Sequence, residues 1–259
     1  MTRTDNDINL RKEKWRKEIS IYHERLTAIT KWRPIVDPNL ISKFPDIPLS
    51  YMPSQKGLAT INISLYIMNN IPIILEASRA FSVLWNIGLF STVTLPVRQI
   101  YETWGATHYA YKLLIAMNNS NEISKINAKL NRLLIGARSE VEMPWGGITN
   151  EKSINVMDFI RSLNDTYLDA EKTYGFLCES CHPSQIRLLE WSMASPYRSN
   201  WDNQVFNKRG HKLLEDTLQA IEIALNGFAL DTKRTLEMAL PCILAEAPEG
   251  TRMVSLSLY

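Results

Sequence analysis

The sequence predicts an all-α protein built as a multi-helix bundle. Apolar residues recur at intervals of three and four along most of the chain, as on one face of a helix. No convincing run alternates apolar and polar residues with the period of two that a strand requires. Glycine is also scarce, with 10 in 259 residues. The length suits one large domain or two smaller ones.

Residues 1–32 are expected to form an N-terminal basic amphipathic helix. Between Asp5 and Thr30 the apolar residues lie on one helical face, and the opposite face is rich in Lys and Arg. Such a face is usually a solvated surface, with nucleic acid or lipid contact as the alternative. The apolar residues are Ile8, Trp15, Ile19, Tyr22, Leu26 and Ile29.

Residues 33–55 are expected to form a proline-rich strap. Five prolines between 33 and 53 are too many for a helix or an interior strand. Apolar residues are spread between these prolines, so we expect the strap to pack along the bundle.

Residues 56–259 are expected to form the helical bundle, as a single domain or as two packed helical halves. The expected helices are 57–69, 72–90, 94–117, 123–134, one or two between 156 and 167, 185–193 and 208–230. The apolar region from Ile61 to Trp104 is interrupted by charges, and its longest uncharged run, Ala80 to Val97, contains polar residues and a proline. We therefore expect a buried helix pair and no membrane span.

Residues 174–184, YGFLCESCHPS, hold the densest group of reactive side chains. Cys178, Cys181 and His182 match the haem attachment pattern C-x-x-C-H, but the polar N-terminus has no apolar export segment. A C-x-x-C redox pair needs a βαβ context, and structural zinc needs more ligands than the lone Cys242 adds. We expect no cofactor, and interpret the cysteines as small apolar residues near a helix end.

Glu179 and His182 have the i, i+3 spacing of di-iron bundles, which carry that pair twice; here it occurs once. Pro183 is expected to end the helix at this point. A histidine at such a break is placed to face a cleft.

The predicted helix 94–117 is the second informative element. Arg98 and Glu102 stand at i, i+4 and share a face, where they either pair with each other or line a wet pocket. An aromatic flank of Tyr101, Trp104, His108 and Tyr111 adjoins them.

Arg98-Gln-Ile-Tyr-Glu102, followed about seventy residues later by Tyr174-x-x-Leu177-x-x-x-x-His182-Pro183, resembles a family of uncharacterised bacterial all-helical proteins. These are distantly related to the HEPN superfamily and to abortive-infection proteins. The resemblance covers roughly residues 72–190. It implies a HEPN-like bundle in which Arg98, Glu102 and His182 converge in one cleft as catalytic residues.

The resemblance also implies a role for each residue. His182 would be the general acid or base, Arg98 would hold a phosphate oxygen and Glu102 would orient one of them. Ribonucleases of the superfamily place an Arg and a His at a short interval on one helix. Here only Arg16 and His23 have that spacing, outside the region of resemblance.

We therefore expect a bacterial defence or toxin-type protein, as in phage defence, with nuclease chemistry at this cleft. The alternatives are a non-enzymatic interaction module, and a metal- or haem-dependent helical oxidoreductase using Glu179 and His182. The expected partner is RNA or another protein, contacted through the basic face at 11–17 with Lys208 and Arg209, and the expected assembly is a homo-oligomer. Three scattered cysteines and the absence of an export segment favour the cytoplasm.

Overall fold

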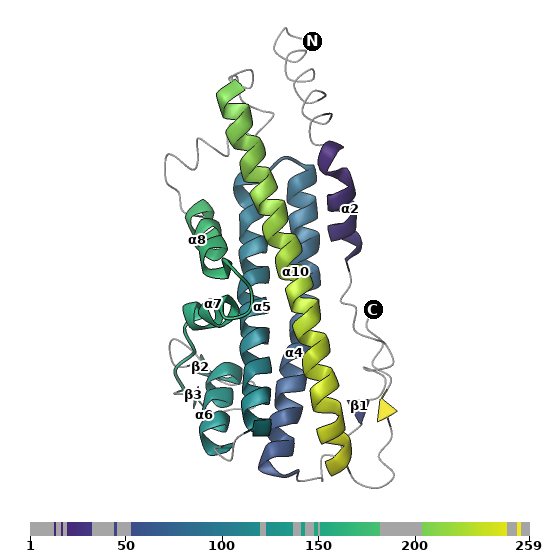
Figure 1. The fold of residues 1–259 in the computed structure, drawn as a ribbon, viewed down its shortest axis with the longest axis vertical. Helices are drawn as coiled ribbons and strands as arrows, with labels where there is room; N and C mark the ends of the chain where they lie inside the picture. The colour runs from purple at the N-terminus through teal and green to yellow at the C-terminus, as the bar shows by residue number, and fades with distance from the viewer. Residues whose placement is uncertain are drawn as a thin grey trace. The chain divides into compact units, whose positions relative to one another are not determined.

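The computed structural model confirms the all-α class (Figure 1). It describes residues 20–32, 53–119, 123–136, 151–181 and 204–247, with the isolated positions 13, 17, 44–45, 141–142, 148–149 and 253–254. The helices are η1 (Ser20–Tyr22), α2 (His23–Lys31), α4 (Gln55–Asn86), α5 (Phe90–Asn119), α6 (Ile123–Leu134), α7 (Val156–Asn164), α8 (Ala170–Cys181) and α10 (Gln204–Glu246). The described strands have two residues each: β1 (Phe44–Pro45) pairs antiparallel with β4 (Met253–Val254), and β2 (Val141–Glu142) with β3 (Ile148–Thr149).

Helix α4 corrects the prediction of two helices at 57–69 and 72–90. The chain forms one helix from Gln55 to Asn86, with Pro72 inside it. A proline inside a helix costs about 3 kcal/mol because it removes one hydrogen bond and crowds the preceding turn. Pro72 itself is exposed. Ile71 and Ile74 beside it are fully buried, and their packing offsets the cost.

Helix α10 also corrects a predicted boundary, because the helix expected at 208–230 continues to Glu246. The apolar seam does not stop at Phe228. It continues through five side chains that are at most 2% exposed, two of them threonines. They are Thr232, Thr235, Leu236, Ala239 and Ile243.

The chain divides into two compact units, each assembled from three segments. Unit 1 consists of Met1–Arg33, Ile73–Tyr101 and Asp169–Leu225; unit 2 consists of Pro34–Pro72, Glu102–Leu168 and Asn226–Tyr259. The boundaries predicted at 32/33 and 55/56 stay predictions.

Unit 1 has an aromatic core around Trp85. Tyr22, Phe81 and Phe90 place their rings 5.3 to 5.9 Å from the Trp85 ring. Tyr22, Leu26 and Ile29 of the predicted amphipathic helix are buried, so the apolar face is confirmed where the structure describes it. Most of residues 1–19 and 33–52 lies outside the described residues, as does the helix predicted at 185–193.

Within unit 2, α5 contacts α7 on one side and α10 on another (Figure 1). Gly105 permits the first contact, because a Cβ there would lie 3.1 Å from Cβ of Phe159. Asn155 caps α7 by accepting a hydrogen bond from the backbone N–H of Met157 at 2.9 Å. These local features fix the turn after α7 beside α5.

Of the described helices, α4 alone is long and apolar enough to cross a membrane by length and composition. The core helix of a soluble protein meets the same criteria, and 44% of its most apolar window is buried inside the protein. The expectation that the chain has no membrane span stays a prediction.

Candidate functional site

The three catalytic residues predicted from the sequence are only partly described. Arg98 belongs to unit 1, where its guanidinium lies 5.7 Å from the centroid of the Tyr174 ring. Glu102 is half-buried in unit 2, and His182 lies outside the described residues. Their convergence in one cleft stays a prediction.

The cysteines before His182 have an ordinary structural setting. Helix α8 is described from Ala170 to Cys181, and the helix end predicted at His182 and Pro183 lies outside the described residues. Cys178 and Cys181 are free thiols and half-buried, and the Cys181 thiol lies 3.6 Å from the Thr94 hydroxyl, which accepts from it. In the part of the chain that the structure describes, no three His, Cys, Asp or Glu side chains are grouped as metal ligands.

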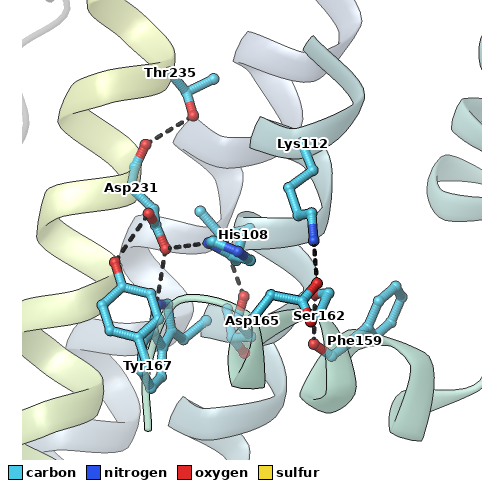
Figure 2. Close-up of polar contacts among 11 residues, drawn as sticks. His108, Lys112, Phe159, Ser162, Asp165, Tyr167, Asp231 and Thr235 are labelled. Carbon is cyan, nitrogen blue, oxygen red and sulfur yellow. Dashed lines mark hydrogen bonds and ion pairs between the residues drawn. The ribbon is translucent and has the colours of Figure 1, made fainter. Parts of the chain in front are cut away.

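A buried polar network in unit 2 is the site that the structure does describe. Asp231 on α10 is fully buried, and its Oδ2 accepts hydrogen bonds from Nε1 of Trp104 at 2.9 Å and Nδ1 of His108 at 3.0 Å. The Tyr167 hydroxyl donates to Asp231 Oδ1 at 3.2 Å (Figure 2). Three donors from α5 and from the turn after α7 therefore meet one carboxylate, which compensates the cost of burying it.

The shared oxygen fixes the tautomer of His108. An indole N–H can only donate, so Asp231 Oδ2 is an acceptor, and the proton in its bond to His108 lies on Nδ1. The other ring nitrogen, Nε2, then offers a lone pair. Nε2 is buried and has no hydrogen-bond partner among the residues described, although His108 as a whole is only 2% exposed.

Tyr167 stays protonated and keeps donating over a wide pH range. Burial raises the pKa of its hydroxyl well above 10.0, and the negative charge of Asp231 adds to the effect. Its ring also packs edge-on at 4.7 Å from Trp104 and 5.7 Å from His108. The aromatic contacts hold the imidazole in one orientation.

The same turn sends a second side chain to the opposite side of His108. Asp165 accepts a hydrogen bond from Lys112 Nζ at 2.6 Å, and Lys112 is one helical turn beyond His108 on α5 (Figure 2). The hydrogen bond from Lys112 and its positive charge lower the pKa of the Asp165 carboxyl. This ion pair is a surface feature, with Lys112 42% and Asp165 67% exposed.

This arrangement has the components of an acid–base centre. Asp231 orients the imidazole and would stabilise the imidazolium that forms when Nε2 takes a proton. Lys112 supplies a positive charge on the same face of α5. The site can accept a proton and sits beside a cation able to contact an anion.

Sequence reasoning found half of this site. Trp104 and His108 were predicted as parts of the aromatic flank on one helix, without a partner. Tyr167 lies at the end of the range 156–167 in which one or two helices are predicted, and Asp231 lies one residue past the predicted end of its helix. The hydrogen bonds join residues 123 and 127 positions apart, so no local pattern marks them.

Comparison of the chain with protein-family models, with curated proteins and with solved structures found no match. The resemblance to HEPN-related proteins therefore stays a proposal.

Proposed function

We propose that this chain is an acid–base enzyme of the bacterial defence or toxin type that acts on RNA, with His108 as the group that takes the proton. The observation behind the proposal is the buried imidazole whose Nδ1–H is bound to Asp231 and whose Nε2 has no partner among the described residues. Buried polar atoms in proteins are almost always hydrogen-bonded, and an unpartnered nitrogen in an oriented His–Asp pair supports a functional role.

RNA suits this chemistry because it carries its own nucleophile. His108 Nε2 would remove the proton of a 2′-hydroxyl, whose oxygen then bonds to the adjacent phosphorus while the bond to the 5′-oxygen breaks. The leaving 5′-oxygen takes a proton from water. A positioned base contributes a factor of about 10² to 10⁴ to such a step.

A basic surface in the same unit supports a nucleic-acid substrate. Helix α6 exposes Lys125, Lys129 and Arg132 along one face and contains no acidic residue. Positive faces of this kind bind the phosphate backbone with an affinity that falls steeply as salt rises. All three cysteines are free thiols, which supports the proposed location in the cytoplasm.

Incubating the purified chain with single-stranded RNA tests the proposal. His108→Gln is expected to slow cleavage by about 10²-fold or more, the contribution of a positioned base. His23→Gln changes an exposed histidine on α2 in the same way and should leave the rate unchanged. Circular dichroism of each variant confirms that it is folded.

The site predicted from the sequence is tested in the same assay. If His182→Ala abolishes cleavage and His108→Gln does not, the Arg98, Glu102 and His182 set carries the activity. If the wild type cleaves no RNA, the enzymatic proposal is wrong.

A second candidate is a non-enzymatic interaction module, acting as a homo-oligomer or on another protein. The observation that favours it is that both Asp231 oxygens are hydrogen-bonded, so the network also serves to specify how α5, α10 and the turn after α7 pack. On this proposal, replacing Asp231 lowers stability, and sedimentation shows an assembly larger than one chain without any RNA cleavage.

A further inference from the structure

Lys112 and Asp165 form an exposed ion pair one helical turn from His108 on α5. Lys112 follows His108 by four residues on α5, so the two side chains share one helical face, with Cβ atoms about 6 Å apart. Figure 2 shows Asp231 on one side of the His108 ring and the Lys112–Asp165 pair on the other. Lys112 thus holds an anion, the carboxylate of Asp165, at the surface one helical turn from His108.

We infer that Lys112 is the anion-binding group of this site and that Asp165 occupies the place of a substrate phosphate, as an intramolecular competitor. The inference rests on the proposed function, because it assigns the substrate contact next to His108. The ligand class is a phosphate or phosphodiester oxygen, presented to Lys112 Nζ.

The strength of the pair permits this exchange. Exposed ion pairs contribute little to stability, since water solvates both charges and the side chains lose entropy when they pair. A phosphate oxygen with its negative charge can therefore replace Asp165 at small cost. Asp165 lies in the short turn between Asn164 of α7 and Tyr167, where it can turn outward while Tyr167 stays on Asp231.

The unpartnered His108 Nε2 gives the second, independent observation. Three titratable groups lie near this ring: Asp231 accepts from Nδ1, the Tyr111 ring lies 6.2 Å away, and Tyr167 donates to Asp231. A hydroxyl carried by the bound phosphodiester would supply the donor that Nε2 lacks among the described residues.

Binding can be measured without any cleavage. The ring signals of the four histidines are followed by NMR while inorganic phosphate is added. In a second arm, a 2′-O-methyl oligonucleotide, which cannot be cleaved by its own hydroxyl, replaces inorganic phosphate. We expect the His108 signals to shift in both arms. If the phosphodiester is the natural ligand, the oligonucleotide should produce the shift at a lower concentration than inorganic phosphate.

Four variants decide the assignment. Asp165→Asn should tighten phosphate binding about two- to five-fold, the factor that a surface ion pair contributes. Lys112→Gln should abolish the His108 shift, and Lys112→Arg should keep it. Asp158→Asn, which removes an exposed carboxylate paired with Arg161 on α7, is the matched control and should bind like the wild type.

Unchanged binding in both Lys112→Gln and Asp165→Asn overturns the inference, even if RNA is cleaved in a His108-dependent way. If phosphate binding depends on Lys112 and Asp165 but the protein cleaves no RNA, the anion site is supported. In that case only the proposed catalytic function is contradicted.

Discussion

Asp231 Oδ2 accepts a hydrogen bond from His108 Nδ1 at 3.0 Å, between side chains that are 0% and 2% exposed. The two residues come from different helices, and Trp104 donates to the same oxygen. A carboxylate so deeply buried is stable only while its donors are in place. This relationship has consequences for stability, for the response to pH and for activity.

Asp231→Asn should destabilise the protein by about 1.5–3 kcal/mol, the cost of losing hydrogen bonds to a buried charged group. The amide carries no negative charge, so the bonds from Trp104 and His108 become weaker neutral ones, and its N–H must face one of three donors, of which only the Tyr167 hydroxyl can accept. Asp158→Asn is the control, because that carboxylate is 53% exposed and 3.8 Å from Arg161. Urea unfolding of both variants is the measurement, and equal free energies of unfolding would show that the buried network contributes nothing.

Gly227→Ala should also be destabilising, by about 1–3 kcal/mol, as expected for overpacking a core. A Cβ on Gly227 would overlap the Trp104 ring and lie 2.8 Å from its Nε1, which would push the indole off Asp231. Gly175→Ala is the matched control on α8, since a Cβ there has nothing within 4 Å. The control should gain up to about 1 kcal/mol from the better helix propensity of alanine. A higher thermal unfolding midpoint for Gly227→Ala than for Gly175→Ala would contradict the packing of Gly227 against Trp104.

The protein should lose stability as the pH rises above about 10, because the buried Tyr101 and the half-buried Tyr167 titrate late. Burial raises the pKa of Tyr167 above its usual value of 10.0, and burial raises the pKa of Tyr101 to about 12. The folded state then keeps protons that the unfolded state releases. The stabilising contribution is fully present below pH 10 and is lost as the pH rises through the folded-state pKa.

Tyr167→Phe should make the fall in unfolding free energy above pH 10 less steep than in the wild type. The substitution also removes the bond to Asp231 and should cost about 1 kcal/mol at neutral pH. Unfolding in denaturant at a series of alkaline pH values measures both effects. A fall of the same steepness in wild type and variant would be evidence against the raised pKa.

The fold class could be predicted because it depends on local periodicity. Helix α6 has the predicted bounds Ile123–Leu134, since its apolar residues repeat regularly. Helix α4 was divided in the prediction at Pro72, where the packing of neighbouring isoleucines outweighs the local cost of proline.

The candidate site could be predicted only in part, for a physical reason. Trp104 and His108 stand one turn apart on α5, so their common face follows from the sequence. Asp231 lies one residue past the end predicted for its helix at 208–230, so the predicted pattern assigned it no place on a helical face. Its burial becomes favourable only through donors on α5 and in the turn after α7, and such long-range compensation has no sequence signature.

The proposed role of His108 as a base depends most on which of its ring nitrogens carries the proton. A long-range ¹⁵N–¹H correlation spectrum of the labelled protein, assigned with His108→Gln, measures this directly. We predict that Nδ1 is protonated and Nε2 is not, and that Asp231→Asn disturbs this pattern. A His108 signal with the proton on Nε2 would show that Asp231 does not orient the imidazole, and the proposed base would be the wrong atom.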